Sequence, residues 1–143
     1  MSEEPTASRE LAETIASLAP VLQSGTFVFC SMFNTSGSQD AISVSRAIFV
    51  EDEGLSMIMP RTEAVRLGMI FDTTFRQITL MVDSTLDSVG LTASVTSALA
   101  VKDISANVVT ASQHAHLFVP SRDADRAVDA LRELQQQAQA AFV

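Results

Sequence analysis

The order of the secondary-structure signals in the second half of the chain restricts its fold more than any other sequence feature. An alternating strand signal at 77–82 precedes a helix at 91–103, and strand signals at 104–111 and 116–119 follow. The last segment, 124–138, carries one apolar stripe at helical spacing. Strand, helix, strand, strand and helix make up most of the β-α-β-β-α-β unit, so we predict a ferredoxin-like α+β fold.

The first half contains a related set of elements in a different order. We expect a helix at 10–22, strands at 26–32, 42–50 and 55–59, and a short helix at 61–67. Gly54 follows the polar turn before the third strand, where glycine accepts the positive φ of a tight hairpin. We therefore predict two similar half-domains, 1–72 and 73–143, each with an antiparallel sheet and helices packed on one face.

Composition excludes several classes of partner. The net charge is −8, from 17 acidic against 9 basic residues, and such a surface repels phosphate backbones. No apolar run approaches the ~20 residues that span a bilayer. The N-terminal residues are acidic and polar, unlike a secretory signal. We therefore expect a cytoplasmic protein that binds neither nucleic acid nor membrane.

Motifs for catalysis are missing from the sequence. The glycines are dispersed and form no phosphate-binding loop, and there is no G-x-S-x-G elbow. Cys30 lies in an apolar run without a histidine nearby, which indicates a small core residue. The acids at 51–53 form a charged run at a hairpin, which is typical of a solvated turn. We expect no enzymatic activity and no cofactor.

The two histidines of the chain are two residues apart. On a strand, His114 and His116 point to the same side, where two imidazoles can hold zinc together with a carboxylate. No third ligand follows at a recognisable spacing, so a role in a turn or on the sheet surface is the preferred interpretation. A metal-dependent enzyme that uses these two histidines is the alternative.

Several segments resemble a bacterial family of small tandem ACT-domain-like proteins. They include Glu51–Leu55, Ile78–Leu80, Ser84–Ala93, Ile104–Val109 and His114–Pro120. The resemblance extends from about Leu11 to Leu134, and its specific part is the second half. One departure is Ala115, since the family pattern often has an acid between the two histidines. A role built on a His-Asp-His cluster therefore does not carry over.

The resemblance implies a small-molecule sensor whose usual ligands are amino acids. ACT domains bind at an interface between two units, near the loop from the first strand to the first helix, which corresponds to 84–92 here. Helix N–H groups at 90–92 suit a carboxylate, and an aspartate of this loop suits an ammonium group. Helix capping and a tight turn are the alternative explanation for these residues. The candidate ligand-binding residues are Asp83, Asp87, Val89, Gly90, Leu91, Thr92 and Asn107.

We therefore predict a non-catalytic regulatory module that binds an amino acid and forms a homodimer. The alternative is a homo-oligomeric interaction protein with no small-molecule ligand. In that case phenylalanines fill its core or its interface, namely Phe27, Phe29, Phe49, Phe71 and Phe75.

Overall fold

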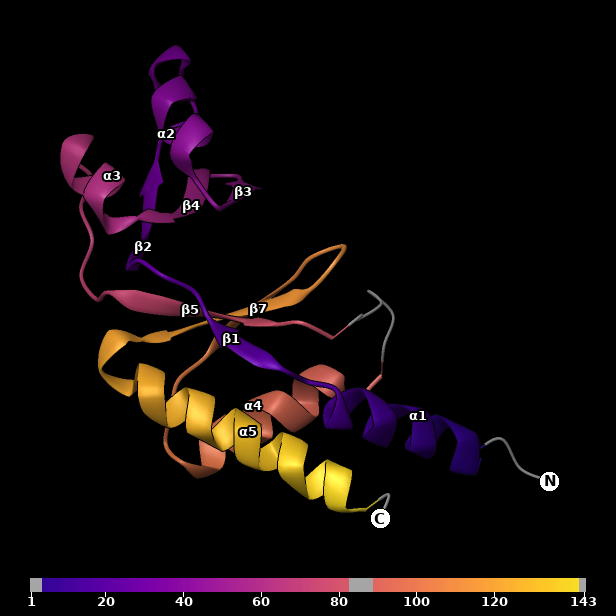
Figure 1. Ribbon diagram of the computed structural model, residues 1–143. Helices are drawn as coiled ribbons and strands as arrows, with labels where there is room; N and C mark the ends of the chain where they lie inside the picture. Colours follow the sequence, from indigo (N-terminus) through magenta and orange to yellow (C-terminus); the bar gives the residue numbers. More distant parts are fainter. Residues whose placement is uncertain (1–3, 83–88, 142–143) are drawn as a thin grey trace. The chain divides into compact units, whose positions relative to one another are not determined.

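The computed structural model describes residues 4–82 and 89–141 (Figure 1). The backbone divides into two compact units. The inserted unit is Ser24–Arg76, and the discontinuous unit combines the chain up to Gln23 with the chain from Gln77 onward. The N-terminal helix thus belongs with the second half of the sequence.

The discontinuous unit contains the helices and strands of that second half together with α1 and β1. Its elements are α1 (Glu4–Ala16), β1 (Pro20–Leu22), β5 (Phe75–Leu80, which begins in the inserted unit), α4 (Leu91–Val101), β6 (Asn107–Thr110), β7 (Ala115–Pro120), the 3₁₀ turn η2 (Ser121–Asp123) and α5 (Ala124–Ala140). Strands β1 and β7 both pair with β5, and β6 lies beyond β7. The pairs β1–β5 and β6–β7 are antiparallel.

Alternation along the strands sends one set of side chains toward the helices. Ile78 of β5 and Leu117 of β7 are fully buried in the core that the helices cover. The buried residues of α4 follow helical spacing, at Leu91, Val95 and Leu99. Helices α1, α4 and α5 lie on one side of these strands (Figure 1), and we call the opposite face, which none of these three helices covers, the helix-free face of this unit.

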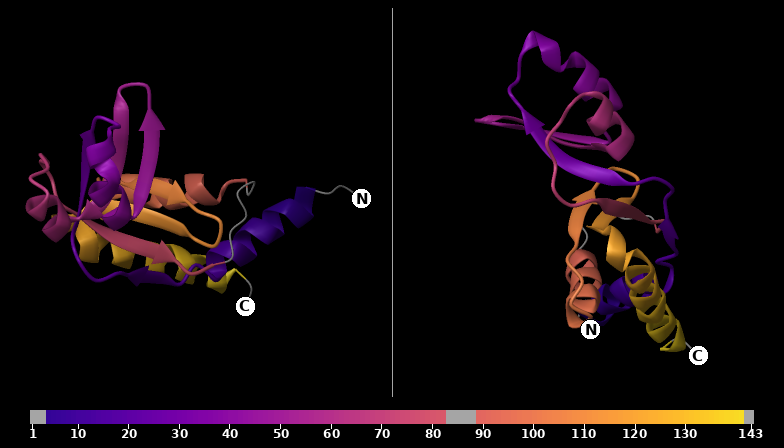
Figure 2. Two further views of the ribbon diagram at one scale, coloured as in Figure 1. Left: turned by 90° about the horizontal axis from the view of Figure 1, so that it is seen from above. Right: turned by 90° about the vertical axis from the view of Figure 1, so that its left-hand side faces the viewer.

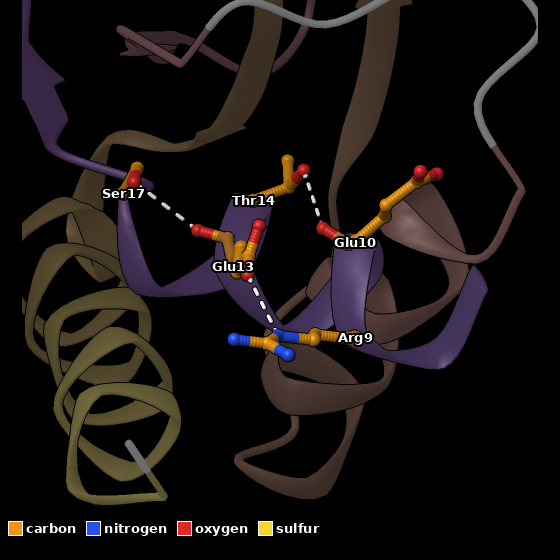
Figure 3. Close-up of polar contacts among 5 residues, drawn as sticks. All are labelled: Arg9, Glu10, Glu13, Thr14 and Ser17. Carbon is orange, nitrogen blue, oxygen red and sulfur yellow. Dashed lines mark hydrogen bonds and ion pairs between the residues drawn. The ribbon is translucent and has the colours of Figure 1, made fainter. Parts of the chain in front are cut away.

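Polar contacts along the turns of α1 hold its solvent-facing side (Figure 3). The Arg9 guanidinium pairs with the Glu13 carboxylate at 3.1 Å, one turn away. The Thr14 hydroxyl donates to the Glu10 carbonyl at 2.9 Å, and the Ser17 hydroxyl to the Glu13 carbonyl at 3.1 Å. Pairs at this spacing stabilise a helix modestly, so α1 depends mainly on the apolar side that it buries.

The predicted helix at 10–22 is wrong at its C-terminal end. Helix α1 stops at Ala16, and Pro20 begins strand β1. Proline has no N–H for a helical bond, and Ala19 takes a φ of 44° to turn the chain out of the helix. Leu18 still enters the same core with no exposed surface, although it does so from the connection after the helix.

The inserted unit is an antiparallel sheet with helices on one face. Its elements are β2 (Phe27–Met32), the 3₁₀ turn η1 (Ser36–Ser38), α2 (Gln39–Val44), β3 (Ala47–Glu51), β4 (Gly54–Pro60) and α3 (Arg61–Arg66). The strand order is β3-β4-β2, with both pairs antiparallel. The core comprises Val28, Cys30, Leu55, Met57 and Met59 of the strands, with Ala41 of α2 and Ala64 of α3.

The predicted strand at 42–50 is wrong in its first part, where α2 lies instead. Thr35 and Ser38 form a capping box, with the Gly37 N–H donating to the Thr35 hydroxyl at 3.3 Å. These polar side chains satisfy the first backbone donors of the 3₁₀ turn η1, and α2 follows that turn directly. The strand begins only at Ala47, after Ser45 has closed α2.

The hairpin between β3 and β4 agrees with the sequence. Glu51 pairs with Gly54, which has a φ of 145°. A β-carbon at this position would lie 2.5 Å from the Met32 carbonyl oxygen, so glycine is required by the close backbone as well as by φ.

Candidate functional site

The N-terminus of α4 is built on a glycine instead of a capping side chain. Gly90 is the N-cap residue, with a φ of 94°, and its carbonyl accepts the Ser94 N–H at 2.9 Å. No side chain caps this end within the described ranges, and the first turn contains no acid. The partial positive charge of the helix terminus is therefore not neutralised by those residues.

Neighbouring residues divide between the core and the solvent. Leu91 is buried among core residues, so only its main chain is available to a ligand. Val89 is 89% exposed and Thr92 is exposed as well. A β-carbon on Gly90 would lie 2.9 Å from Cδ2 of Leu11, so α1 closes one side of this position.

Two of the predicted ligand-binding residues, Asp83 and Asp87, lie outside the described residues. Asn107 begins β6, three residues after Ile104, whose N–H donates to the Leu99 carbonyl at 3.0 Å. Asn107 thus follows the C-terminal end of α4, a helix about 16 Å long with Gly90 at its other end.

A buried polar cluster crosses the helix-free face of the discontinuous unit. The Gln77 amide donates to the Thr79 hydroxyl at 3.1 Å. His116 Nδ1 lies 2.9 Å from the Thr79 hydroxyl and 3.2 Å from the Gln77 amide nitrogen. An amide NH₂ and a hydroxyl both donate, so this geometry suits a neutral His116 that is protonated on Nε2. Gln77 and Thr79 are only 5% and 3% exposed.

The sequence did not indicate that Gln77 and Thr79 belong to this buried polar cluster. Their alternation with Ile78 and Leu80 predicts a half-buried strand with polar side chains facing water. Instead all four residues are buried. The only available signal was a glutamine and a threonine on one face of a strand, a pattern that does not distinguish a solvated face from a buried hydrogen-bonded one.

The ring of His114 lies edge to face with that of His116, with centroids 6.4 Å apart. The two-residue spacing therefore places both rings on one side. His114 Nδ1 is buried, and no hydrogen-bond partner for it is found in the described part of the chain.

Metal-binding and nucleophilic sites find no support in residues 4–82 and 89–141. No group of three or more His, Cys, Asp or Glu side chains that could hold a metal ion occurs there. Cys30 lies in the core of the inserted unit, where burial raises the pKa of its thiol and disfavours the reactive thiolate. Over the same residues, no helix is long and apolar enough to cross a membrane.

A cleft of about 280 Å³ lies beside the β3–β4 turn of the inserted unit. Its lining residues are Ser31, Met32, Phe33, Glu51, Glu53, Gly54, Leu55 and Ser56. The Glu51 carboxylate already accepts a hydrogen bond from the Ser56 hydroxyl. Among the described residues, the lining contains no buried side-chain nitrogen or oxygen that lacks a hydrogen-bond partner.

Comparison with known domain families gives matches over most of the chain. One ACT domain model matches residues 6–76 and a second ACT domain model matches residues 72–133. No match was found among curated proteins.

Solved structures give the same picture. A Vibrio cholerae protein of unknown function, described as a possible transport protein, shares 35% identity over 90% of this chain and 98% of its own, with a TM-score of 0.80. An Agrobacterium tumefaciens protein has 19% identity over 81% and 87% of the two chains, with a TM-score of 0.64. The regulatory subunit of aspartate kinase from Thermus flavus has 10% identity over 82% and 98%, with a TM-score of 0.58. The predicted ferredoxin-like α+β fold of ACT type is thereby confirmed.

Proposed function

The chain belongs to the ACT domain family, and from that premise we propose that it is a non-catalytic regulatory module that binds an amino acid at the N-terminus of α4. Family membership supports a regulatory, ligand-binding type of module. The ligand and its position are the proposal, and they rest on the chemistry of the helix terminus.

The open N-terminus of α4 carries this proposal. A helix that begins on a left-handed glycine, without a capping side chain among the described residues, offers its first N–H groups to an external acceptor. A carboxylate is the acceptor that gains most, because the helix dipole adds to the hydrogen bonds.

The residues around the N-terminus of α4 determine from which side a ligand can approach. Val89 and Thr92 are exposed and leave the terminus open to solvent, whereas Leu11 closes it on the side of α1. Asp83 and Asp87 remain predicted partners for the ammonium group. Asn107 is left out of the proposed site because it follows the far end of α4.

Regulation would follow from differential binding. A ligand that binds one state of the protein more tightly shifts the population toward that state and transmits the signal to a partner or to a homodimer equilibrium. The alternative, an interaction protein without a ligand, uses the same fold and differs only in what the N-terminus of α4 does.

We would test ligand binding by a thermal-shift screen of the twenty amino acids, with Thr92→Asp as the diagnostic variant. At a ligand concentration a hundred times the dissociation constant, binding stabilises the native state by about 2.7 kcal/mol, or roughly 5–10 °C in Tm for a chain of this size. An aspartate in the first turn stabilises the helix by about 0.3–1 kcal/mol and repels a carboxylate. We therefore expect the variant to have a higher Tm without ligand and no ligand shift.

Ser97→Asp is the matched control, since Ser97 is exposed on α4 outside its first turn. This variant should keep the full ligand shift. An amino acid that stabilises wild type and Thr92→Asp equally would place the site elsewhere. A panel without any stabilising member would favour the ligand-free alternative. Thr92→Asp is preferable to Gly90→Ala, because an alanine there meets Leu11 and a strained φ whether or not a ligand binds.

A further inference from the structure

Side chains as well as backbones join strands β5 and β7 on the helix-free face of the discontinuous unit. The two strands are neighbours in the sheet, and the left view of Figure 2 shows the pink strand β5 beside the orange strand β7. The side-chain link runs from Gln77 and Thr79 of β5 to His116 of β7. Because Gln77 and Thr79 are buried, neither can replace a lost partner freely with water.

This link requires an imidazole nitrogen that carries no proton. The Gln77 amide nitrogen, 3.2 Å from His116 Nδ1, can only donate. The Thr79 hydroxyl, 2.9 Å from the same Nδ1, accepts from that amide and donates its own proton to the ring. A protonated imidazole has an N–H at Nδ1 as well as at Nε2, so proton uptake would direct three donors toward one another. At least one of the two hydrogen bonds between β5 and β7 is then lost.

The strands around His116 contain no carboxylate that would stabilise a charged imidazole. Strands β1, β6 and β7 have no Asp, Glu, Lys or Arg, and β5 has only Arg76, which alternation directs to the side opposite Gln77. Val109 of β6 lies opposite His116. In these strands and the turn before β7, the other titratable group on this side is His114, with its ring centre 6.4 Å from that of His116. This environment disfavours a positive charge.

We propose that His116 is a pH-sensitive switch between β5 and β7, in which the neutral imidazole joins the strands and proton uptake releases the side-chain link. The inference concerns the discontinuous unit alone and is independent of the amino-acid ligand. In the unfolded chain a histidine takes up a proton near pH ~6.5, whereas the native cluster holds it neutral. The native state therefore binds fewer protons, so this contribution to stability is complete above that pH and is lost as the pH falls below it.

The pH dependence of unfolding measures the effect of this switch. A histidine that stays neutral in the native state lowers the folding equilibrium constant about tenfold between about pH 7.5 and about pH 5.5. Urea unfolding of the full chain at both pH values gives the total change, to which carboxyl groups also contribute. His116→Gln isolates the contribution of the imidazole, because glutamine offers a carbonyl acceptor and takes up no proton. The change in wild type should exceed the change in this variant about tenfold.

His114→Gln is the matched control. It makes the same substitution two residues away on the same side of the strand and leaves the link between Gln77, Thr79 and His116 in place. This variant should keep the pH dependence of wild type. If His116→Gln loses as much stability in acid as wild type does, or if His114→Gln flattens the pH dependence equally, the proposal is overturned.

A titration followed by NMR tests the link without any substitution. At the higher pH, the ¹⁵N shifts of the ring should show a neutral His116 with its proton on Nε2. The ring should stay neutral down to the lower pH, and the side-chain amide signals of Gln77 should move only when His116 takes up its proton. A proton on Nδ1 at the higher pH, or protonation that leaves the Gln77 amide unchanged, would contradict the proposal. This measurement uses the wild-type chain, so it decides even where His116→Gln fails to fold, and it involves no amino-acid ligand.

Discussion

Thr79 is a buried polar residue that links two other polar side chains in the discontinuous unit. Its hydroxyl joins the Gln77 amide to the imidazole of His116 at a position that is only 3% exposed. Polar groups that lose a partner in a buried position cost far more than the same groups at the surface, because they cannot exchange that partner for water. The cluster therefore fixes how β5 and β7 meet on the helix-free face.

We predict that Thr79→Val lowers the free energy of unfolding by about 1–3 kcal/mol, because the amide and the imidazole each lose a hydrogen-bond partner. Urea unfolding followed by circular dichroism measures this change. Thr110→Val is the control, since Thr110 is an exposed strand residue at the end of β6 and its substitution should stay within about 0.5 kcal/mol of wild type. Equal effects of the two substitutions would show that the cluster contributes nothing particular.

Individual residues were the least predictable level from sequence. Gly54 and Gly90 were identified because positive φ and turns restrict residue type strongly, and both have positive φ. Gln77 and Thr79 could not be identified, because the burial of a polar strand residue depends on what covers the sheet. Asn107 begins β6, beyond the C-terminal end of α4. The local sequence did not reveal this position, because it depends on the path that the chain takes after the helix.

At the scale of elements, two glutamines of α5 hydrogen-bond the chain at the C-terminal end of α1. Gln135 Nε2 donates to the Ala16 carbonyl at 3.0 Å, and its Oε1 accepts the Ala19 N–H at 3.1 Å. Gln139 Nε2 donates to the same Ala16 carbonyl at 3.0 Å. These side chains satisfy the last turn of α1, where backbone carbonyls have no partner within the helix.

We predict that Gln135→Ala destabilises the protein by about 1–2 kcal/mol, because it removes a donor and an acceptor from the end of α1. Gln136→Ala is a matched control one residue away on the exposed side of α5, and it should be nearly neutral. Hydrogen exchange adds a second reading, in which Gln135→Ala should speed exchange in the last turn of α1 and Gln136→Ala should not. If both variants unfold at the same urea concentration as wild type, the glutamine contact does not hold the helix end.

Element types were predicted well where one local rule acted alone. Periodicity predicted the helices α4 and α5, and the alternation at 77–82 predicted most of the strand β5. The two errors arose where rules competed. In α1 the apolar stripe continued past Ala16, but Pro20 and the Gln135 contact ended the helix. In α2 the β-branched residues favoured a strand, but α2 continues the 3₁₀ turn η1, which the capping box of Thr35 and Ser38 starts.

At the scale of the whole molecule, the order of elements determined the fold class, because few arrangements bury a strand–helix–strand–strand–helix unit. The compact units were harder to foresee from sequence. Residues up to Gln23 pack with the second half of the chain, an arrangement that rests on the pairing of β1 with β5 across more than fifty residues. Pairing over such a separation leaves no local signal.

At the scale of the whole molecule, the proposed function requires that the first turn of α4 bind the carboxylate of an amino acid. We would record ¹H–¹⁵N spectra of the full chain while adding the amino acid that gives the greatest thermal shift, or an equimolar mixture of the twenty if none does so. Saturable shifts of the Leu91, Thr92 and Ala93 amides, lost in Thr92→Asp and kept in Ser97→Asp, are the predicted result. Unchanged amides in this turn, or saturable shifts confined to other residues, would mean that α4 is not the ligand site.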